Sequence, residues 1–193
     1  MKKIYLMLIV SFLSIASFSQ KKKAPAQKGN ETSALPKLDN FQVEVRNSNF
    51  QVAIIEKGKP KDAIVVKTVD ATFTPINCKL TSFTANGVKL YLLSWTETSI
   101  TKTELKTENK SMVYSVIYEM TAKKQVFSNY QLTNNMTEKV FLDKNKTASE
   151  TQEKIRREGF EFILNPDGSI IQKNKTQQNM LVYDKDKMEF KKK

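Results

Sequence analysis

The stretch that decides the fold is Cys78-Lys-Leu-Thr-Ser-Phe-Thr-Ala-Asn-Gly-Val-Lys-Leu-Tyr-Leu-Leu-Ser-Trp95. Two apolar-rich runs flank its central Asn-Gly pair, which is typical of a type I′ turn because both central residues need a positive φ. That turn fixes the register of an antiparallel hairpin, in which Phe83 faces Leu90 on one side and Leu80 faces Leu93 on the other. Since both sides carry apolar pairs, the hairpin is predicted to be central and covered on both faces.

Outside this hairpin, residues 41–56 and 112–132 alternate apolar and polar side chains with the period of two that is typical of half-buried strands, and 63–69 is apolar on both faces. Further strands are predicted at 41–46, 50–56, 63–69, 73–76, 112–120, 126–132, 137–143, 160–164, 169–172, 180–183 and 188–190. A polar loop at 57–61 is expected to interrupt the pairing between two of them. The pattern predicts a mainly β protein, an antiparallel meander that forms either a two-layer sandwich or an open or closed barrel.

One short surface helix is predicted near 148–158. Thr147-Ala-Ser-Glu150 fits a capping box, and Gly159 stands where a glycine commonly ends a helix. The charged pairs within the segment have the four-residue spacing that stabilises a helix. Ile155 is its one large apolar residue, so the helix is expected to lie lightly attached to the surface.

The N-terminus has the pattern of a secretory signal peptide over residues 1–19. Lys2 and Lys3 precede an apolar run, and Ser17-Phe18-Ser19 places small residues before a cut that would leave Gln20 first. The ending Phe-Ser-Gln resembles the signals of exported proteins in the Bacteroidota, a resemblance that covers the signal alone. The run is shorter than the ~20 apolar residues of a membrane span. Export to the periplasm or the extracellular space is therefore predicted.

The rest of the chain is predicted to form a disordered basic linker at 20–39, one β-rich domain at 40–190 and a basic tail at 191–193. The formal net charge is +12, yet residues 40–190 hold 22 basic and 18 acidic side chains, so the excess lies mainly in the ends. A nucleic-acid groove would concentrate basic residues in the folded domain, and no nucleic-acid partner is expected. Lys21, Lys22 and Lys23 are instead candidates for contact with an anionic envelope surface.

Several classes of site are excluded by composition. The chain has no His, one Cys and five Gly. Nucleophilic pairs that depend on His, metal sites that depend on His or several Cys, and glycine-rich phosphate loops are therefore absent. We predict no catalytic residue, no cofactor and no metal ligand. The hairpin register places Cys78 opposite Trp95, where it is expected to be a small buried apolar residue.

Carboxylates are the groups that leave an enzymatic alternative open, because glycoside hydrolases use two of them. Glu97, Glu104, Glu119 and Glu161 lie on or beside predicted strands. Glu119 interrupts an apolar strand, but alternation places it opposite Tyr118 and Met120 and predicts that it faces solvent.

Aromatic residues gather on the second predicted hairpin and opposite Cys78. Tyr114, Tyr118, Tyr130 and Trp95 are the candidate ligand-contacting residues. Core packing is one interpretation, and stacking against a ligand inside a cup or barrel is the other.

The sequence therefore favours an exported, non-catalytic β-rich protein of the bacterial cell envelope with a binding or structural role. Two alternatives remain open, a carrier of an apolar ligand in a barrel or half-barrel and a carboxylate-dependent glycan hydrolase. A filled core would favour the first interpretation and a cavity of ~300 Å³ or more a carrier. A cleft with two carboxylates ~5–10 Å apart would favour the hydrolase.

Overall fold

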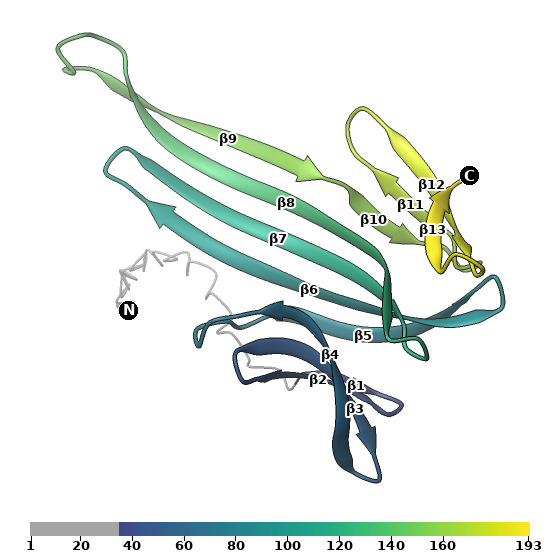
Figure 1. Ribbon diagram of the computed structural model, residues 1–193. Coiled ribbons are helices and arrows are strands. Elements are labelled where there is room, and N and C mark those ends of the chain that lie inside the picture. Colours follow the sequence, from purple (N-terminus) through teal and green to yellow (C-terminus); the bar gives the residue numbers. More distant parts are fainter. Residues whose placement is uncertain (1–34) are drawn as a thin grey trace, which may run out of the picture. The chain divides into compact units, whose positions relative to one another are not determined.

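The computed structural model describes residues 35–193, which form thirteen strands in three antiparallel sheets (Figure 1). The N-terminal sheet holds β1 (Lys37–Leu38), β2 (Phe41–Arg46), β3 (Asn49–Glu56) and β4 (Lys59–Thr68). The central sheet holds β5 (Ile76–Ala85), β6 (Val88–Lys102), β7 (Lys106–Glu119), β8 (Lys124–Phe141) and β9 (Ser149–Gly159). The C-terminal sheet holds β10 (Glu161–Leu164), β11 (Ile170–Lys173), β12 (Gln178–Asp184) and β13 (Glu189–Lys192).

Each strand pairs with its neighbour in the chain, which makes every sheet a meander. The predicted antiparallel, mainly β fold is therefore confirmed. None of the three sheets in residues 35–193 closes on itself, so the sandwich alternative holds and the closed barrel does not. No helix in this range is long and apolar enough to cross a membrane.

The deciding hairpin has the predicted register. Ala85 pairs with Val88, Phe83 with Leu90 and Leu80 with Leu93. Asn86 and Gly87 have φ values of 48° and 77°, as a type I′ turn requires. The expected pair of Cys78 and Trp95 is wrong, because the register shifts between Ile76 and Lys79, where Asn77 adopts a positive φ of 52°.

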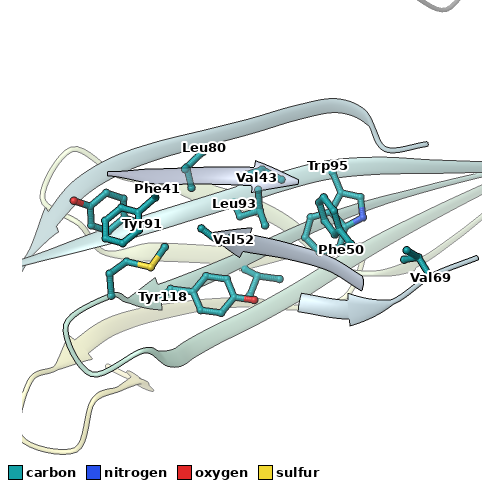
Figure 2. Packing of buried hydrophobic residues seen from close by; sticks show 12 residues of the cluster. Phe41, Val43, Phe50, Val52, Val69, Leu80, Tyr91, Leu93, Trp95 and Tyr118 are labelled. Atoms are coloured by element: carbon teal, nitrogen blue, oxygen red, sulfur yellow. The ribbon is translucent and has the colours of Figure 1, made fainter. Parts of the chain in front are cut away.

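One face of the hairpin packs against the N-terminal sheet. Trp95 lies edge-on to Phe50 of β3 with ring centroids 5.1 Å apart, and Tyr91 lies edge-on to Phe41 of β2 at 4.8 Å (Figure 2). The buried members of this first cluster are Phe41, Val43, Phe50, Val52, Val69, Leu80, Tyr91, Leu93, Trp95, Val116, Tyr118 and Met120. Asp39 also ties the two layers, since it accepts hydrogen bonds from Lys89 Nζ at 2.8 Å and from the Tyr91 hydroxyl at 2.7 Å.

The opposite face of the hairpin packs against the C-terminal sheet. The buried members of this second cluster are Ala85, Leu90, Ile117, Val126, Ile170 and Tyr183. Phe83, Leu92 and Phe127 of the central sheet pack around them. The hairpin is therefore covered on both faces, as predicted, but β5 is an edge strand of the central sheet rather than a central one. The sandwich has three layers there rather than two.

The second hairpin, β7–β8, pairs Met112 with Leu132, Tyr114 with Tyr130 and Val116 with Ser128. A bulge at Ile117/Tyr118 then shifts the register by one residue. Val126 consequently joins the second cluster instead of the face that carries Tyr118.

The predicted helix near 148–158 is wrong, because these residues belong to β9. They pair with β8 from Phe141–Ser149 to Gln131–Gly159 without a break. Thr147 does not cap a helix, since its backbone N–H and hydroxyl donate to Asp143 in the β8–β9 turn. Helix propensity is a weak preference that tertiary context overrides, and this segment instead pairs with β8 along its whole length.

Gly159 is the point at which the chain leaves the central sheet for the C-terminal sheet. Its φ is +76°, and a Cβ there would lie 2.2 Å from the Tyr130 carbonyl oxygen. The next residue, Phe160, donates its N–H to the same oxygen at 3.1 Å. Glycine is needed here for close backbone approach between two strands, and not to end a helix.

The domain boundaries also differ from the prediction. Lys37 and Leu38 form β1 inside the segment predicted as a disordered linker, and Lys191 and Lys192 form part of β13 instead of a tail. The predicted loop at 57–61 is only a two-residue turn at Lys57-Gly58, so β3 and β4 stay paired. Residues 73–75 form no strand. The predicted signal peptide and Lys21–Lys23 lie outside the described residues.

The strands of the central sheet continue well past the two clusters (Figure 1). We call this part the distal extension and define it as residues 97–102, 106–112, 132–141 and 149–157. Its exposed apolar side chains include Ile100 and Ile155, which are 74% and 62% exposed. Neither cluster holds a residue of this segment of β9. The central sheet thus has a half covered on both faces and a half that is not.

Candidate functional site

Three of the four predicted ligand-contacting residues belong to the first cluster. Trp95 and Tyr118 are 3% and 1% exposed, and Tyr114 stacks on Trp95 with ring centroids 4.7 Å apart. Tyr130, the cross-strand neighbour of Tyr114, is 47% exposed. These four residues line none of the three hollows described below.

A salt bridge lies at the edge of this group of aromatic residues. Lys67 of β4 donates to both oxygens of Glu97 at 2.9 and 3.0 Å, and Trp95 Nε1 donates to Glu97 at 2.8 Å. The Lys67 ammonium also lies 5.1 Å from the Phe73 ring centroid and 5.8 Å from that of Tyr114. The protein's own lysine therefore takes the position that a cationic ligand would take over these rings.

Burial raises the pKa of one hydroxyl and one thiol in the covered half. The Tyr118 hydroxyl has no hydrogen-bond partner among the described residues, and burial raises its pKa to about 12. Burial likewise raises the pKa of the Cys78 thiol to about 12. A thiol in that setting is a poor nucleophile, because the thiolate is the reactive form.

The candidate carboxylates do not come together. Glu97 lies at the margin of the first cluster, Glu104 in the β6–β7 turn and Glu161 on β10. Glu119 does not face solvent as predicted, since it is 9% exposed and accepts hydrogen bonds from the backbone N–H groups of Thr121 and Ala122 at 3.2 and 2.5 Å. It caps the β7–β8 turn, a role that strand alternation alone does not reveal.

The largest of the three hollows lies where β9 meets the C-terminal sheet, and we call it the basic hollow. Its volume is about 700 Å³. Its lining comes from β8, β9, β10, β11 and the β11–β12 turn: Gln131, Ile155, Arg156, Arg157, Glu158, Gly159, Glu161, Lys173, Asn174, Lys175 and Thr176.

Four cationic and two anionic side chains line the basic hollow, which leaves it two positive charges in excess. Arg156 pairs with Glu158 at 2.6 Å, and Lys173 pairs with Glu161 at 3.5 Å. Arg157 and Lys175 form no ion pair with any residue in 35–193. The hollow therefore offers two cationic groups to a ligand.

The wall that carries Lys175 is held by hydrogen bonds. The Asn174 side chain accepts from the backbone N–H groups of Thr176 and Gln177 at 2.9 and 3.0 Å. The Asn174 N–H donates to the Gln177 carbonyl at 2.9 Å, which closes the β11–β12 turn. The turn backbone is thus ordered before any ligand arrives.

The two faces of the distal extension differ in chemistry. On the side that continues the first cluster, which we call the charged face, Glu108 pairs with Lys106 at 2.7 Å and with Lys110 at 3.2 Å. Hydrogen bonds from these two lysines lower the pKa of Glu108 to about 2. Glu138 and Lys154 form another pair on this face at 3.6 Å. Much of its charge is therefore already compensated.

The opposite side, which we call the hydroxyl face, continues the second cluster and borders the basic hollow. Strand pairing places the following rows across it: Thr98, Ser111, Thr133 and Arg157; Ile100, Asn109, Asn135 and Ile155; Lys102, Thr107, Thr137 and Glu153. Ile155 and Arg157 belong both to these rows and to the lining of the hollow. The two surfaces are therefore continuous.

Two smaller hollows complete the description. One of about 510 Å³ lies beside the Asn86 turn and includes Asp167, Asp184 and Asp186, and one of about 380 Å³ lies beside Phe41, Tyr91 and Met120. Lys191 pairs with Asp184 at 2.7 Å. Within residues 35–193, no three Asp, Glu, His or Cys side chains are grouped in a way that could hold a metal ion.

Sequence reasoning missed the basic hollow because it took β9 for a helix. A helix would have separated Arg156 from Arg157 by about 100° and paired Arg157 with Glu153. On a strand, Arg157 turns to the face of the β11–β12 turn, where Lys175 lies. The available signal was Lys173-Asn-Lys175, a basic turn between two short strands.

Comparisons with known proteins add no information on this site. No protein-family model matches the chain, and neither a curated protein nor a solved structure matches it.

Proposed function

We propose that the protein is an exported, non-catalytic β-rich protein of the bacterial cell envelope, with a binding role. The observation that carries this proposal is the distal extension, a long polar sheet surface that the protein's own layers leave uncovered. A surface of this length contributes little burial to the fold, so a binding role gives it a use. Export rests on the sequence pattern of residues 1–19.

The filled core argues for a surface binder over a carrier of an apolar ligand. Trp95, one of the aromatic residues that would line a carrier's cavity, packs against Phe50 of β3 and stacks on Tyr114. The basic hollow is lined mainly by polar and charged side chains, with Ile155 as its one large apolar residue. Carrier cavities are mostly apolar and enclose their ligand.

The carboxylates argue for binding over glycan hydrolysis. Glu158 and Glu161 both line the basic hollow, but each already has a cationic partner. Glu161 is exposed and Glu158 is half-buried. A glycosidase's general acid needs a setting that keeps it protonated, which an apolar and buried environment provides.

Lys21, Lys22 and Lys23 would add an electrostatic contact with an anionic envelope surface. The C-terminal lysines contribute less free charge, because Lys191 donates a hydrogen bond to the Asp184 carboxylate. We expect the mature chain to bind vesicles of anionic lipids more weakly when residues 20–34 are removed. The difference in affinity between the two chains should decrease at high salt.

The experiment that tests the proposal has two parts. Cells that make the protein natively are fractionated. The envelope fraction should contain a form whose intact mass corresponds to a chain that begins at Gln20. The purified mature chain is then incubated with a panel of neutral and acidic glycans, and no reducing ends should be released. Protein confined to the cytoplasm, or turnover of any glycan, would contradict the proposal.

A further inference from the structure

We propose that the basic hollow and the adjoining hydroxyl face form one binding surface for an acidic polysaccharide, a polymer whose sugar rings carry both carboxylates and hydroxyl groups. This inference rests on the proposed binding role and names the site and the ligand class. It requires a cationic anchor, a fixed geometry and a hydroxyl-rich track that leads away from the anchor, and the molecule has all three.

The anchor consists of Arg157 and Lys175. Both line the basic hollow, and neither forms an ion pair within residues 35–193, whereas Arg156 and Lys173 do. Arg presents a planar fork that suits a carboxylate, and Lys adds a point charge from the opposite wall. An anion that enters the hollow would meet two cations without first breaking a salt bridge.

The geometry of the anchor is fixed from two sides. Arg157 lies on β9 within an unbroken ladder to β8, opposite Thr133. Lys175 lies in the turn that the Asn174 side chain closes by hydrogen bonds to Thr176 and Gln177. Between the two walls, β9 meets β8 at Gly159 and Gln131. Binding would therefore require side chains to order, and little backbone rearrangement.

The track begins at Arg157 and continues along the hydroxyl face. It crosses Thr133, Ser111 and Thr98 in one row and Thr137 and Thr107 two rows further on. Residues 151–159 of β9 span about 26 Å at a strand's rise of ~3.3 Å per residue. That length accommodates several sugar units, and hydroxyl and amide side chains can both donate to and accept from their hydroxyl groups.

Charge and shape favour a polysaccharide over other polyanions. The hollow's lining has no aromatic ring on which a nucleic-acid base could stack, and two carboxylates reduce its positive charge. It is concave and holds one large apolar residue, Ile155, whereas a lipid surface is best met by several apolar side chains. Ile155 can instead cover the C–H face of a sugar ring.

The test measures the affinity of the mature chain for polygalacturonate by isothermal titration calorimetry, with dextran as the neutral polymer. One double variant, R157Q/K175Q, removes the two anchor charges. A matched double variant, K144Q/K185Q, removes two charges from exposed lysines outside the hollow. Circular dichroism and urea unfolding confirm that both variants fold like the natural chain.

The expected result is binding of polygalacturonate but not of dextran, with Kd about tenfold higher or more for R157Q/K175Q and within about twofold for K144Q/K185Q. Affinity should fall between ~20 mM and ~300 mM salt. Equal losses in the two double variants, binding of dextran with similar affinity, or no binding of polygalacturonate would each overturn the inference.

A single-stranded oligonucleotide and vesicles of phosphatidylglycerol serve as further probes. If either bound as tightly as polygalacturonate and lost affinity in R157Q/K175Q, the ligand class would be wrong although the site is right. These outcomes are distinguishable from failure of the proposed function, which is decided by location in the envelope and by the absence of glycan turnover.

Discussion

The covered half of the central sheet and the distal extension share the same strands but differ in what surrounds them. In the covered half, Leu93 and Ile117 on opposite faces are both fully buried, each by a different neighbouring sheet. In the distal extension the ladder of hydrogen bonds continues through the same β6, β7 and β8, while Ile100 and Ile155 are exposed. Backbone pairing therefore sets the geometry of both halves, and burial of apolar side chains stabilises mainly one.

The largest expected effect separates the two halves directly. Leu93→Ala should lower the free energy of unfolding by about 3–4 kcal/mol, because it leaves a cavity in a filled cluster. Ile100→Ala, in the distal extension, should change it by less than about 0.5 kcal/mol. Urea unfolding followed by circular dichroism measures both. Similar losses would mean that the distal extension is covered in solution.

Substitution of Gly159, which lies where the two halves meet, should lower the free energy of unfolding by nearly as much. Gly159→Ala should cost about 3 kcal/mol, because the new Cβ meets the Tyr130 carbonyl and the residue has a positive φ. Gly87→Ala is the matched control, since Gly87 has a similar φ and no atom near its Cβ position. It should cost about 1–2 kcal/mol from backbone strain alone. Equal costs would show that β8 yields to the added methyl group.

A smaller change, in the opposite direction, is expected at Tyr118. Its buried hydroxyl has no partner within residues 35–193, so Tyr118→Phe should raise the free energy of unfolding by up to about 1 kcal/mol. Tyr130→Phe makes the same chemical change at a residue that is 47% exposed and should have no measurable effect. Destabilisation by Tyr118→Phe would reveal a hidden partner for the hydroxyl, such as a buried water.

The smallest expected effect concerns pH and the charged face. The pKa of Glu108 is lowered from an ordinary value of 4.5 to about 2, so its ion pairs stabilise the fold above about pH 4.5 and that contribution is lost as pH falls towards 2. Glu108→Gln should lower the urea midpoint slightly at pH 7, and most of that difference should be gone near pH 2.

Glu153→Gln provides the control for this pH series, because Glu153 lies on the hydroxyl face and forms no ion pair within residues 35–193. Its midpoint should equal that of the natural chain at both pH values. Since the lysines around Glu108 are exposed, added salt should reduce the effect of Glu108→Gln. A difference as large at pH 2 as at pH 7 would exclude the ion pairs as its cause.

The same comparison explains how far the sequence predicted the structure. In the covered half, burial imposes alternation on the residues, so the register around Asn86-Gly87 and the two apolar faces could be predicted. In the distal extension neither face needs apolar residues. The strand β9 therefore carries charges on both faces, its period of two is hidden, and its composition favoured a helix.

Departures from ideal strand pairing also limited what could be predicted from the sequence. The bulge at Ile117/Tyr118 moves Val126 to the other face, and the irregularity near Asn77 interrupts the ladder where Cys78 would have paired with Trp95. Bulges depend on how a strand bends against its neighbours, which a single-sequence pattern does not encode. The basic hollow needed both β9 as a strand and its position beside the β11–β12 turn, so it could not be predicted from the sequence.

Gly159 also has a consequence for how the chain is made. Within each sheet every strand pairs with the one before it, so each sheet can form as residues leave the ribosome. The apolar face around Leu90 and Ile117 nevertheless stays open until the residues after Gly159 have followed, because the C-terminal sheet alone covers it. Until the last 34 residues have been synthesised, the central sheet of the nascent chain has its hydrogen bonds but exposes this apolar face. The chain is therefore most prone to aggregate at the end of its synthesis.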